Sequence, residues 1–206
     1  MGQMRCKLLL ATNNKGKVNE YRSLLAGVEF DLVSLADLGI SAIVDETGKS
    51  FEENARLKAM AYARESGLLA LADDSGLEVD ALGGEPGIMS ARYAGEGASD
   101  EDRVNHLLSR LKDVPWEERS ARFRCVIAVA TPDGQVALSE GECLGMIALV
   151  PRGEYGFGYD PVFYFLELDK TMAELPPEIK NKISHRGRAA KQVPALLSGP
   201  PFACSE

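Results

Sequence analysis

The sequence predicts an α/β protein in which a mixed β-sheet is flanked by helices. In the first half of the chain, short apolar runs alternate with segments of helical periodicity, a pattern typical of strands and helices in turn. In the second half, two long β-like runs are joined by Pro132-Asp133-Gly134, which is a hairpin turn signal. Strands that alternate with helices early and a long hairpin later favour a mixed sheet with helices packed around it.

The chain opens with a strand, a polar loop and a helix. Lys7–Thr12 is short and almost fully apolar, as expected for a buried strand. Asn13–Lys17 is a polar turn, and the helix after it runs to Ala26, because Gly27 is a stop signal. The apolar residues of that helix recur at helical spacing: Val18, Tyr21 and Leu25. Phe30–Leu35 is the next expected strand.

The second helix carries its own start and stop signals. Ser50 and Glu53 have the spacing of a capping box, and Gly67 is a natural C-terminal stop after an alanine-rich stretch. Leu68–Ala72 is again short and apolar, so a buried strand is expected there. We expect this strand to end in the turn Asp73-Asp74-Ser75-Gly76.

Three further segments follow that turn. Glu78–Leu82 is a candidate for a short strand, and the glycine-rich stretch Gly83–Gly97 indicates a long loop. Ser99 and Asp102 form a second capping box, so a helix is expected to begin there. The apolar stripe of this helix consists of Val104, Leu107, Leu108 and Leu111.

The rest of the chain combines the hairpin with short helices. The two hairpin strands are Ala121–Thr131 and Gln135–Val150. Gly153–Gly158 is a glycine-rich loop that precedes a strand at Val162–Phe165. The C-terminal segment is expected to hold short helices that begin at Thr171 and Ser184.

Length and composition place the chain among ordinary globular proteins, as a single α/β domain or a closely joined pair of lobes. A length of 206 residues, with 45% hydrophobic and 26% charged residues, is usual for that class. The formal net charge of -8 argues against a nucleic-acid-binding protein, because such proteins neutralise phosphates with basic residues. No apolar run approaches the roughly 20 residues of a membrane span. We therefore expect neither a nucleic-acid nor a membrane partner.

The four cysteines indicate neither a metal site nor a redox motif. Cys6, Cys125, Cys143 and Cys204 are scattered, and no pair has C-x-x-C spacing. Cys125 and Cys143 lie in apolar, strand-like runs, where a reduced cysteine packs as a small hydrophobic side chain. We expect reduced cysteines, in keeping with a cytoplasmic protein.

The first polar loop is a candidate phosphate-binding site. It lies at the C-terminal end of a strand and opens a helix, where ligands of open α/β sheets gather and N–H groups attract phosphate. Its lysines add positive charge and its glycine allows close approach of the backbone, although the P-loop pattern is absent. A solvated turn is the alternative. The residues concerned are Thr12, Asn13, Asn14, Lys15, Gly16 and Lys17.

Two adjacent acids after a buried strand are the sharper signal. Carboxylates resist desolvation, so Asp73 and Asp74 would be costly there unless a divalent metal such as Mg²⁺ compensated them. Adjacent residues of an extended chain point in opposite directions, so we expect only one of the pair to face a ligand. A β-turn that favours aspartate is the alternative. Asp45-Glu46 is a second acidic pair, which would complete the metal site if it lay beside Asp74.

The C-terminal third contains an aromatic loop and a basic cluster. Phe157 and Tyr159 lie among glycines in Gly156–Pro161, where they would offer stacking surfaces for a base, or else cover the core. Lys180–Arg186 is a basic cluster in an acidic protein. If Ser184 caps a helix, the two residues after it occupy a first turn that disfavours cations, which hints at a functional role for them.

In this order, five segments resemble the inosine triphosphate pyrophosphatase family, also called XTP/dITP diphosphatases. The segments are ATNNKGK, DETGKSFEENARLKA, ADDSGLEVDALGGEPGIMSARYAG, GFGYDP and KNKISHRGRA. The resemblance runs from Leu8 to about Leu197, nearly the whole chain, and the third segment is its most specific part. Asp45 stands where many members carry glutamate, which keeps a carboxylate with a shorter reach.

The resemblance implies a reaction, a cofactor and an assembly. The reaction is hydrolysis of ITP, dITP or XTP to the monophosphate and pyrophosphate, with Mg²⁺ as cofactor. A homodimer is implied, as is an elongated, two-lobed α/β fold with the active site in the cleft between the lobes. Residues 1–206 would then form a single nucleotide pyrophosphatase domain.

The resemblance also implies roles for particular residues. The loop Thr12–Lys17 would cradle the triphosphate, and Asp45 and Asp74 would hold Mg²⁺. Asp74 would also accept the proton of the attacking water, and Ser75 would touch the substrate. The residues placed around the base are Phe157, Gly158, Tyr159, Asp160, Lys180, His185 and Arg186.

Two other functions are compatible with parts of this pattern. A related house-cleaning pyrophosphatase for pyrimidine or modified nucleotides would share the fold and the metal chemistry, but the base-side segments argue against it. A non-catalytic nucleotide sensor or RNA-binding module would carry a broad basic face, whereas this chain has a net charge of -8 and acids in strand-end loops.

Overall fold

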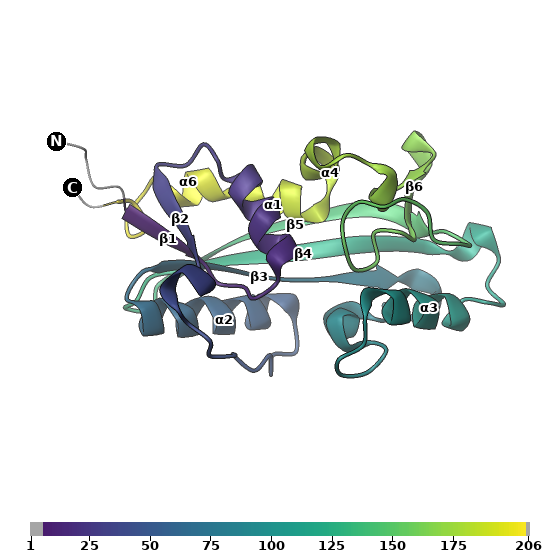
Figure 1. The fold of residues 1–206 in the computed structure, drawn as a ribbon, viewed down its shortest axis with the longest axis horizontal. Coiled ribbons are helices and arrows are strands. Elements are labelled where there is room, and N and C mark those ends of the chain that lie inside the picture. Colours follow the sequence, from purple (N-terminus) through teal and green to yellow (C-terminus); the bar gives the residue numbers. More distant parts are fainter. Residues whose placement is uncertain (1–5, 205–206) are drawn as a thin grey trace. The chain divides into compact units, whose positions relative to one another are not determined.

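The computed structural model describes residues 6–204, whose strands form a seven-stranded mixed sheet (Figure 1). The strands are β1 (Cys6–Leu10), β2 (Phe30–Ser34), β3 (Leu69–Val79), β4 (Ser120–Ala130), β5 (Val136–Ile147), β6 (Phe163–Phe165) and β7 (Lys170–Thr171), in the spatial order β2-β1-β3-β4-β5-β6-β7. Strand β1 is parallel to β2 and β3, and β6 is antiparallel to β5 and β7. The predicted mixed sheet flanked by helices is confirmed. Residues 1–5 and 205–206 of the predicted domain lie outside the described residues.

The chain is divided into two compact units. The first consists of Met1–Asp74, Cys125–Gly141 and Arg188–Glu206, and the second of Ser75–Arg124 and Glu142–Gly187. The boundaries fall within strands β3, β4 and β5, so each of these strands contributes residues to both units. No helix within residues 6–204 is long and apolar enough to cross a membrane.

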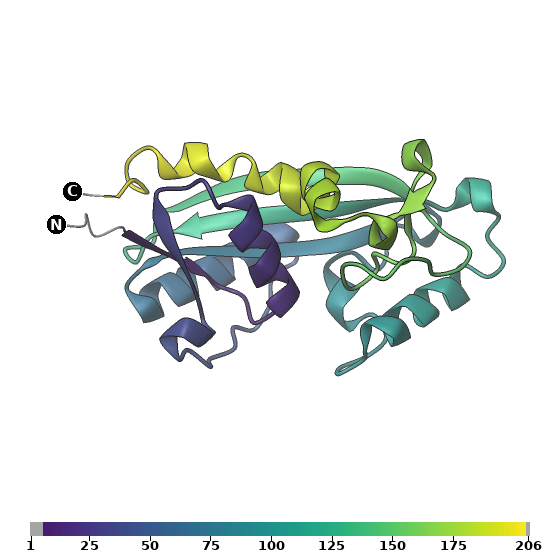
Figure 2. The same ribbon diagram turned by 45° about the horizontal axis from the view of Figure 1, so that its top comes forward.

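Helices cover both faces of the strands in the first unit. Figure 1 shows α2 (Phe51–Ser66) on the opposite side of β1 and β3 from α1 (Lys15–Leu24) and α6 (Val193–Leu197). In the turned view of Figure 2, α1 and the yellow C-terminal helices remain on the same side of these strands. The core on that side includes Leu8, Leu10, Tyr21, Leu25, Leu71, Ile127, Val193 and Leu197. Because both faces are covered, most of β1 and the first part of β3, Leu69–Ala72, read as apolar runs in the sequence.

The local signals of α2 are those predicted from the sequence, with one change. The Ser50 hydroxyl accepts a hydrogen bond from the Glu53 N–H, and Gly67 ends the helix with φ of 66°. The Glu53 carboxylate accepts from the backbone of Lys49 at 2.7 Å instead of from the cap residue. It therefore secures the loop that enters the helix.

The predicted turn after residue 72 is wrong. Asp73, Asp74, Ser75 and Gly76 lie inside β3, which continues to Val79, and Asp80–Leu82 is a 3-10 turn where a separate short strand was expected. Aspartate, serine and glycine favour turns, but here the side chains of Asp73 and Asp74 are buried and bound by partners from helices. Tertiary contacts therefore outweigh the local turn preference.

The second unit is built around α3 (Asp100–Arg110) and the ends of the long strands. Both hydrogen bonds of the predicted capping box between Ser99 and Asp102 are present. The core of this unit includes Leu77, Val104, Leu107, Leu111, Phe123, Ile147, Val162, Phe163 and Met172. A helix that the sequence did not reveal, α4 (Pro177–Ile183), precedes α5 (His185–Ala190), and the predicted loop 83–97 contains a 3-10 segment at Gly87–Arg92.

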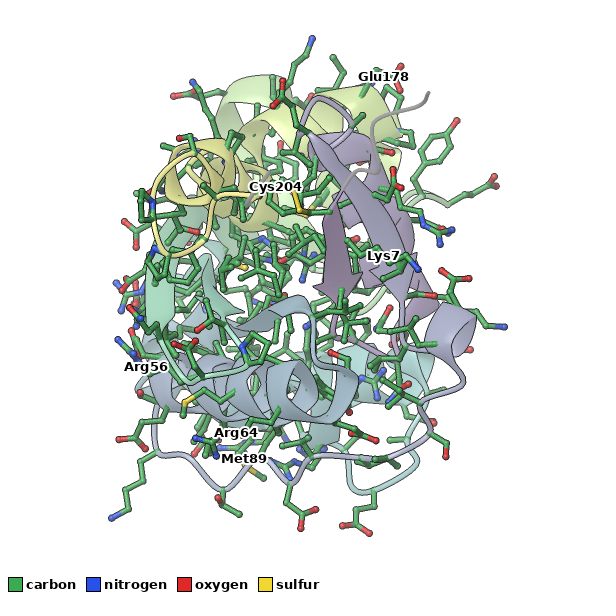
Figure 3. The ribbon with its side chains drawn as sticks, turned by 90° about the vertical axis from the view of Figure 1, so that its left-hand side faces the viewer. Lys7, Arg56, Arg64, Met89, Glu178 and Cys204 are labelled. Atoms are coloured by element: carbon green, nitrogen blue, oxygen red, sulfur yellow. A yellow bond between two sulfur atoms is a disulfide. The ribbon has the colours of Figure 1, made fainter. Side chains whose placement is uncertain are left out.

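The cysteines differ from the expectation in one pair. Cys125 and Cys143 are buried and not joined in a disulfide, as predicted. Cys6 and Cys204 form a disulfide that links the start of β1 to the C-terminal segment, so the prediction that these two are reduced is wrong. Figure 3 shows the sulfur at Cys204 beside the purple strand β1. A pairing across 198 residues leaves no spacing signal, because only the fold brings the two cysteines together.

Candidate functional site

Strand β3 directs its two adjacent aspartates to opposite faces. Asp73 lies toward α1, where its Oδ1 is 3.1 Å from Lys17 Nζ. Asp74 lies toward α2, where its Oδ2 accepts a hydrogen bond of 3.1 Å from Asn54 Nδ2. Side chains alternate along a strand, so the two acids cannot share a partner on one face. The expected opposite orientation of the pair is therefore what the structure shows.

One face of α2 holds Asp74 in place. Asn54 and Lys58 are four residues apart, so they lie one above the other on the helix surface. Lys58 Nζ is 3.2 Å from Asp74 Oδ1 and 2.6 Å from Glu46 Oε1. The ammonium group therefore joins a carboxylate of the sheet to one of the loop before α2.

The same face of α2 also fixes that loop. Asn54 Oδ1 accepts from the Gly48 N–H at 2.8 Å, and the Tyr62 hydroxyl donates to the Ala42 carbonyl at 2.8 Å. A β-carbon on Gly48 would lie 2.6 Å from Asn54 Oδ1, so the close approach needs glycine. The loop that carries the second acidic pair is thus held to the helix at two points.

Burial and neighbouring charges set the protonation of this cluster. Burial raises the pKa of Asp74, and Glu46 adds to that effect while Lys58 and Lys17 oppose it. Burial lowers the pKa of Lys58, but the nearby carboxylates raise it by more, and Asp74 contributes most to that increase. The net shift of the Lys58 pKa is therefore upward. The cluster thus combines a carboxyl group of raised pKa with a firmly protonated lysine. Such a carboxyl group is suited to accept a proton near neutral pH.

The predicted metal ligand Asp45 is exposed, whereas its neighbour Glu46 lies in the cluster. Within the described residues, no three His, Cys, Asp or Glu side chains are gathered so that they would hold a metal ion by themselves. Two carboxylates that share one cation are nevertheless a suitable donor set for a hard divalent ion that also binds phosphate and water.

The predicted phosphate loop is ordered by its own side chains. The Asn14 side chain caps α1 by accepting from the Lys17 N–H at 3.1 Å, and the Asn14 N–H donates to Thr12 Oγ1 at 3.2 Å. Thr12, Asn13 and Lys15 line a pocket of about 290 Å³. The loop therefore presents a helix N-terminus with two lysines, one of which is fixed by Asp73.

In the second unit, the aromatic loop exposes only one of its two rings. Phe157 is half-buried, whereas Tyr159 is 4% exposed, and its hydroxyl donates to the Ser90 carbonyl at 2.9 Å. Burial accordingly raises the pKa of Tyr159. Tyr159 belongs to the core, so the ring available for stacking is that of Phe157.

Asp160 and Lys180 form a buried pair beside that ring. Lys180 Nζ is 2.5 Å from Asp160 Oδ2 and 4.8 Å from the centre of the Phe157 ring. Arg186 Cζ is 5.6 Å from the same ring, and Arg186 Nη2 donates to Ser75 Oγ at 2.9 Å. Two cations within cation–π range of one ring fix its surroundings.

His185 follows the helix cap at Ser184. The Ser184 hydroxyl accepts from the Gly187 N–H at 3.1 Å, in keeping with the predicted helix start. The His185 ring is buried and stacks on Phe123, with ring centres 4.6 Å apart, and its Nδ1 is 3.9 Å from Cys143 Sγ. His185 therefore packs with the core of the second unit.

Comparison with known proteins identifies the group to which this chain belongs. A family model described as the Ham1 family matches residues 8–195, which is most of the sequence. The chain belongs to the Ham1 family. This confirms the resemblance inferred from the five motifs.

Curated relatives and solved structures agree with this assignment. The chain is 50% identical over 189 residues to a protein of Bacillus subtilis named dITP/XTP pyrophosphatase, covering 92% of this chain and 96% of that one. It is 55% identical over 183 residues to a protein of the same name from Geobacter sulfurreducens, covering 89% and 92%. A HAM1 protein structure from Coxiella burnetii matches with a TM-score of 0.84 and 42% identity over 94% of this chain and 98% of that one.

Two residues beside the predicted site residue Asp74 in this Ham1 protein, Asn54 and Lys58, are not evident from the sequence alone. Asn54 and Lys58 lie in the motif DETGKSFEENARLKA, where the local pattern indicates only a helix, yet both contact Asp74. Their spacing of four residues, on a helix that follows an acidic pair, was the available signal. The chain itself connects the two groups, because Asp74 in the first unit is followed directly by Ser75 in the second.

Proposed function

We propose that this Ham1 protein hydrolyses dITP, ITP and XTP to the nucleoside monophosphate and pyrophosphate. The observation that carries the proposal is the setting of Asp74, a buried strand carboxylate held by Asn54 and Lys58 and joined through Lys58 to Glu46. Relatives that share half of its residues over nine-tenths of the chain are named for this activity. A general base beside a cluster that attracts cations is what hydrolysis of a phosphoanhydride requires.

Magnesium is the proposed cofactor. Glu46 and Asp74 already converge on a positive charge, the Lys58 ammonium group, so the pair fits a cation. Asp74, together with Asp45 or Glu46, would hold Mg²⁺ in the substrate complex. Bound there, the ion would neutralise phosphate charge and polarise the phosphorus centre that is attacked. A site of two carboxylates that leaves the remaining positions to phosphate oxygens and water is typical of this ion.

Asp74 is the proposed proton acceptor for the attacking water. Its Oδ2 is held by Asn54 and its Oδ1 by Lys58, so the carboxylate is held in one orientation. The upward shift of its pKa brings the group closer to the operating pH, where a general base is most effective. The positive charge of Lys58 opposes this upward shift of the Asp74 pKa.

The phosphate loop Thr12–Lys17 is proposed to bind the triphosphate. Lys15 and Lys17 supply positive charge, and the N-terminus of α1 supplies N–H groups for phosphate oxygens. The Asp73 carboxylate holds the Lys17 ammonium group at 3.1 Å and so limits the positions that it can take. Positioning of this kind reduces the entropy lost when the substrate binds.

The second unit is proposed to bind a purine base. Phe157 offers a ring for stacking, and Ser75, Lys180 and Arg186 offer hydrogen-bond donors. Gly158, Tyr159 and Asp160 support this arrangement through the backbone and the core. His185 supports it by stacking on Phe123. We propose that residues 1–206 form one nucleotide pyrophosphatase domain.

We further propose a cytoplasmic homodimer that acts on free nucleotides and not on nucleic acid. A net charge of -8 disfavours binding to nucleic acid. Large apolar side chains that are more than half exposed, Leu144, Leu149, Val150 and Leu166, support self-association of the second unit. Light scattering of the purified protein, expected to give twice the mass of one chain, tests the dimer.

A nucleotide panel tests the activity. The protein is incubated with ITP, dITP, XTP, ATP, GTP and the pyrimidine triphosphates in Mg²⁺, and pyrophosphate and orthophosphate are measured separately. Pyrophosphate release, fastest with ITP, dITP and XTP and abolished by a chelator, is the expected result. Orthophosphate as the product contradicts the proposed chemistry. Preference for a pyrimidine or modified nucleotide indicates a related house-cleaning enzyme, and binding without turnover indicates a sensor.

A further inference from the structure

A residue outside the predicted site contacts the aromatic loop through its backbone. Asp100 is the first residue of α3, and its Oδ2 accepts a hydrogen bond of 2.7 Å from the Gly158 N–H. The two residues are 58 positions apart in the sequence. The other carboxylate oxygen of Asp100 pairs with Arg103, which is one helical turn further along. The loop is therefore tied to a helix that contributes no predicted binding residue.

The anchor on Asp100 is itself rigidly held. Arg103 Nη1 donates to the Ala98 carbonyl at 2.6 Å and to the Ala91 carbonyl at 3.2 Å. The guanidinium group thus joins the carboxylate to the chain before α3. A hydrogen bond to an ionised acceptor is stronger than one to a neutral acceptor, so Asp100 is a firm attachment point for the Gly158 N–H.

The other residues next to Phe157 are fixed as well. Asp160 Oδ2 accepts from the Phe157 N–H at 2.9 Å, and the Tyr159 hydroxyl binds Ser90. Gly156 has φ of 77°, and a β-carbon there would lie 2.0 Å from Asp160 Oδ2, so this tight turn requires glycine. Gly158 also has a positive φ, of 63°, which makes its conformation easily lost unless its N–H is bound.

The Phe157 side chain is half-buried, unlike those of Tyr159 and Asp160 in the same loop, which are buried. Its ring lies within 4.8 Å of Lys180 Nζ and 5.6 Å of Arg186 Cζ. The direction of the ring follows from the backbone on either side of it, and the C-terminal side is the Gly158 peptide that Asp100 holds. A base stacks well only when the ring is held in one plane, because each freely rotating group must be ordered on binding.

We propose that Asp100 is a positioning residue for base binding: through the Gly158 N–H it orients Phe157 against the base. The inference rests on the proposed function, because it assumes that the aromatic loop binds the nucleotide base. Asp100 itself would touch neither substrate nor cofactor. Its effect belongs to binding and not to the chemical step, for which the proposed groups surround Asp74 in the first unit.

Kinetics of two variants of the same helix test the proposal. Asp100→Ala removes the acceptor for Gly158. Asp102→Ala is the matched control, because its carboxylate bonds to Ser99 and its loss weakens the cap of α3 without touching the loop. We expect Asp100→Ala to raise KM for ITP about tenfold with kcat nearly unchanged, as for loss of a hydrogen bond that serves binding alone. Asp102→Ala should lower Tm and leave KM unchanged.

Two further measurements separate positioning of the base from general damage. Inhibition by pyrophosphate, which lacks a base, should be the same in Asp100→Ala and wild type, whereas inosine monophosphate should bind about tenfold more weakly. Hydrogen exchange at the Gly158 amide should become faster in Asp100→Ala and remain slow in Asp102→Ala. Asp100→Asn, which keeps an acceptor oxygen, should restore part of the affinity.

Specific results would overturn the proposal. Equal increases of KM in both variants would assign the effect to the stability of α3. A parallel loss of pyrophosphate binding, or a fall of kcat at unchanged KM, would remove the link to the base. If the wild type is active and Asp100→Ala has the same KM, only the role of Asp100 is contradicted. If the wild type hydrolyses no purine triphosphate, the proposed function is contradicted as well.

Discussion

Lys58 Nζ lies 3.2 Å from Asp74 Oδ1, so an ammonium group whose side chain is only 12% exposed is in direct contact with the proposed general base. The lysine comes from α2 and the aspartate from β3, and Asn54, one turn earlier on the helix, holds the other oxygen of the same carboxylate. The proposed general base is therefore clamped by a single helix face. Predictions for both members of the pair follow from this geometry.

Replacement of Asp74 should abolish turnover. Asp74→Asn keeps the size of the side chain but removes the charge that binds a cation and accepts a proton. Loss of a general base costs about 10²–10⁴-fold in rate, and a weakened metal site should add to that loss. Measurement of kcat for ITP, with Tm to check folding, tests this. Near-normal activity in a folded variant would exclude Asp74 from the mechanism.

Asp73→Asn serves as the matched comparison. Asp73 points to the other face of β3 and pairs with Lys17, so its loss should free the lysine without removing the base. We expect a higher KM and a lower Tm, with a much smaller decrease of kcat than in Asp74→Asn. The opposite ranking of the two kcat values would mean that the roles of the two acids are exchanged.

Removal of Lys58 should make stability depend on pH and on magnesium. In Lys58→Met the carboxylates of Asp74 and Glu46 lose their shared cation, which should cost about 3 kcal/mol of unfolding free energy at neutral pH. The pKa of Asp74 is already raised by burial and should rise further. A group whose pKa is raised on folding favours the folded state at low pH and loses that effect as pH rises through the folded pKa.

The loss of unfolding free energy in Lys58→Met, relative to wild type, should therefore be large at pH 7. It should shrink as the pH falls below the raised pKa of Asp74. Urea unfolding at several pH values measures it, and Lys49→Met, an exposed lysine of the preceding loop, is the control. Mg²⁺ should raise Tm more in Lys58→Met than in wild type, because the ion would replace the missing cation. A deficit independent of both pH and Mg²⁺ would contradict the ion-pair explanation.

Reduction of the Cys6–Cys204 disulfide should lower stability without affecting activity. The two cysteines are 198 residues apart in the sequence. A disulfide across a loop of that size stabilises the folded protein by up to about 5 kcal/mol, if its only effect is to reduce the entropy of the unfolded chain. Cys6 lies at the start of β1, whereas the phosphate loop follows the other end of that strand, so turnover should not change. Tm with and without dithiothreitol tests this. Cys204→Ser should match the reduced protein and show no response to the reductant.

The choice of base should depend on Arg186 more than on Phe157. Arginine carries only donors, which suit the C6 oxygen of hypoxanthine and would face the amino group of adenine. We expect Arg186→Ala to lower kcat/KM for ITP far more than for ATP, because sites built on hydrogen bonds discriminate by up to about 10⁴ or more. Phe157→Ala should weaken both nucleotides about equally, since every base stacks.

Arg188→Ala is the control for this comparison, because Arg188 lies on the same helix with an exposed side chain. It should leave the ratio of kcat/KM for ITP to that for ATP unchanged. An unchanged ratio in Arg186→Ala would place the discrimination elsewhere, for example in backbone groups.

The sequence by itself determined the elements whose signals are local. Helix α2 begins after Ser50 and ends at Gly67, and α3 begins at the capping box of Ser99 and Asp102. The apolar run after residue 7 is a strand. Each of these signals acts through neighbours within a few residues. The motifs also picked out Asp74 and Phe157 as candidates. Alternation along an extended chain was enough to separate Asp73 from Asp74.

Only the tertiary structure decided what those residues contact. Asp73-Asp74-Ser75-Gly76 has the composition of a turn, yet partners on α1 and α2 keep it in a strand. The sequence makes Tyr159 and Phe157 equal candidates for stacking on a base, but packing buries Tyr159 and leaves Phe157 half-exposed. Contacts such as Gly158 with Asp100, or Cys6 with Cys204, join residues far apart in the chain. No local pattern encodes them, because they exist only once the whole sheet and its helices have packed.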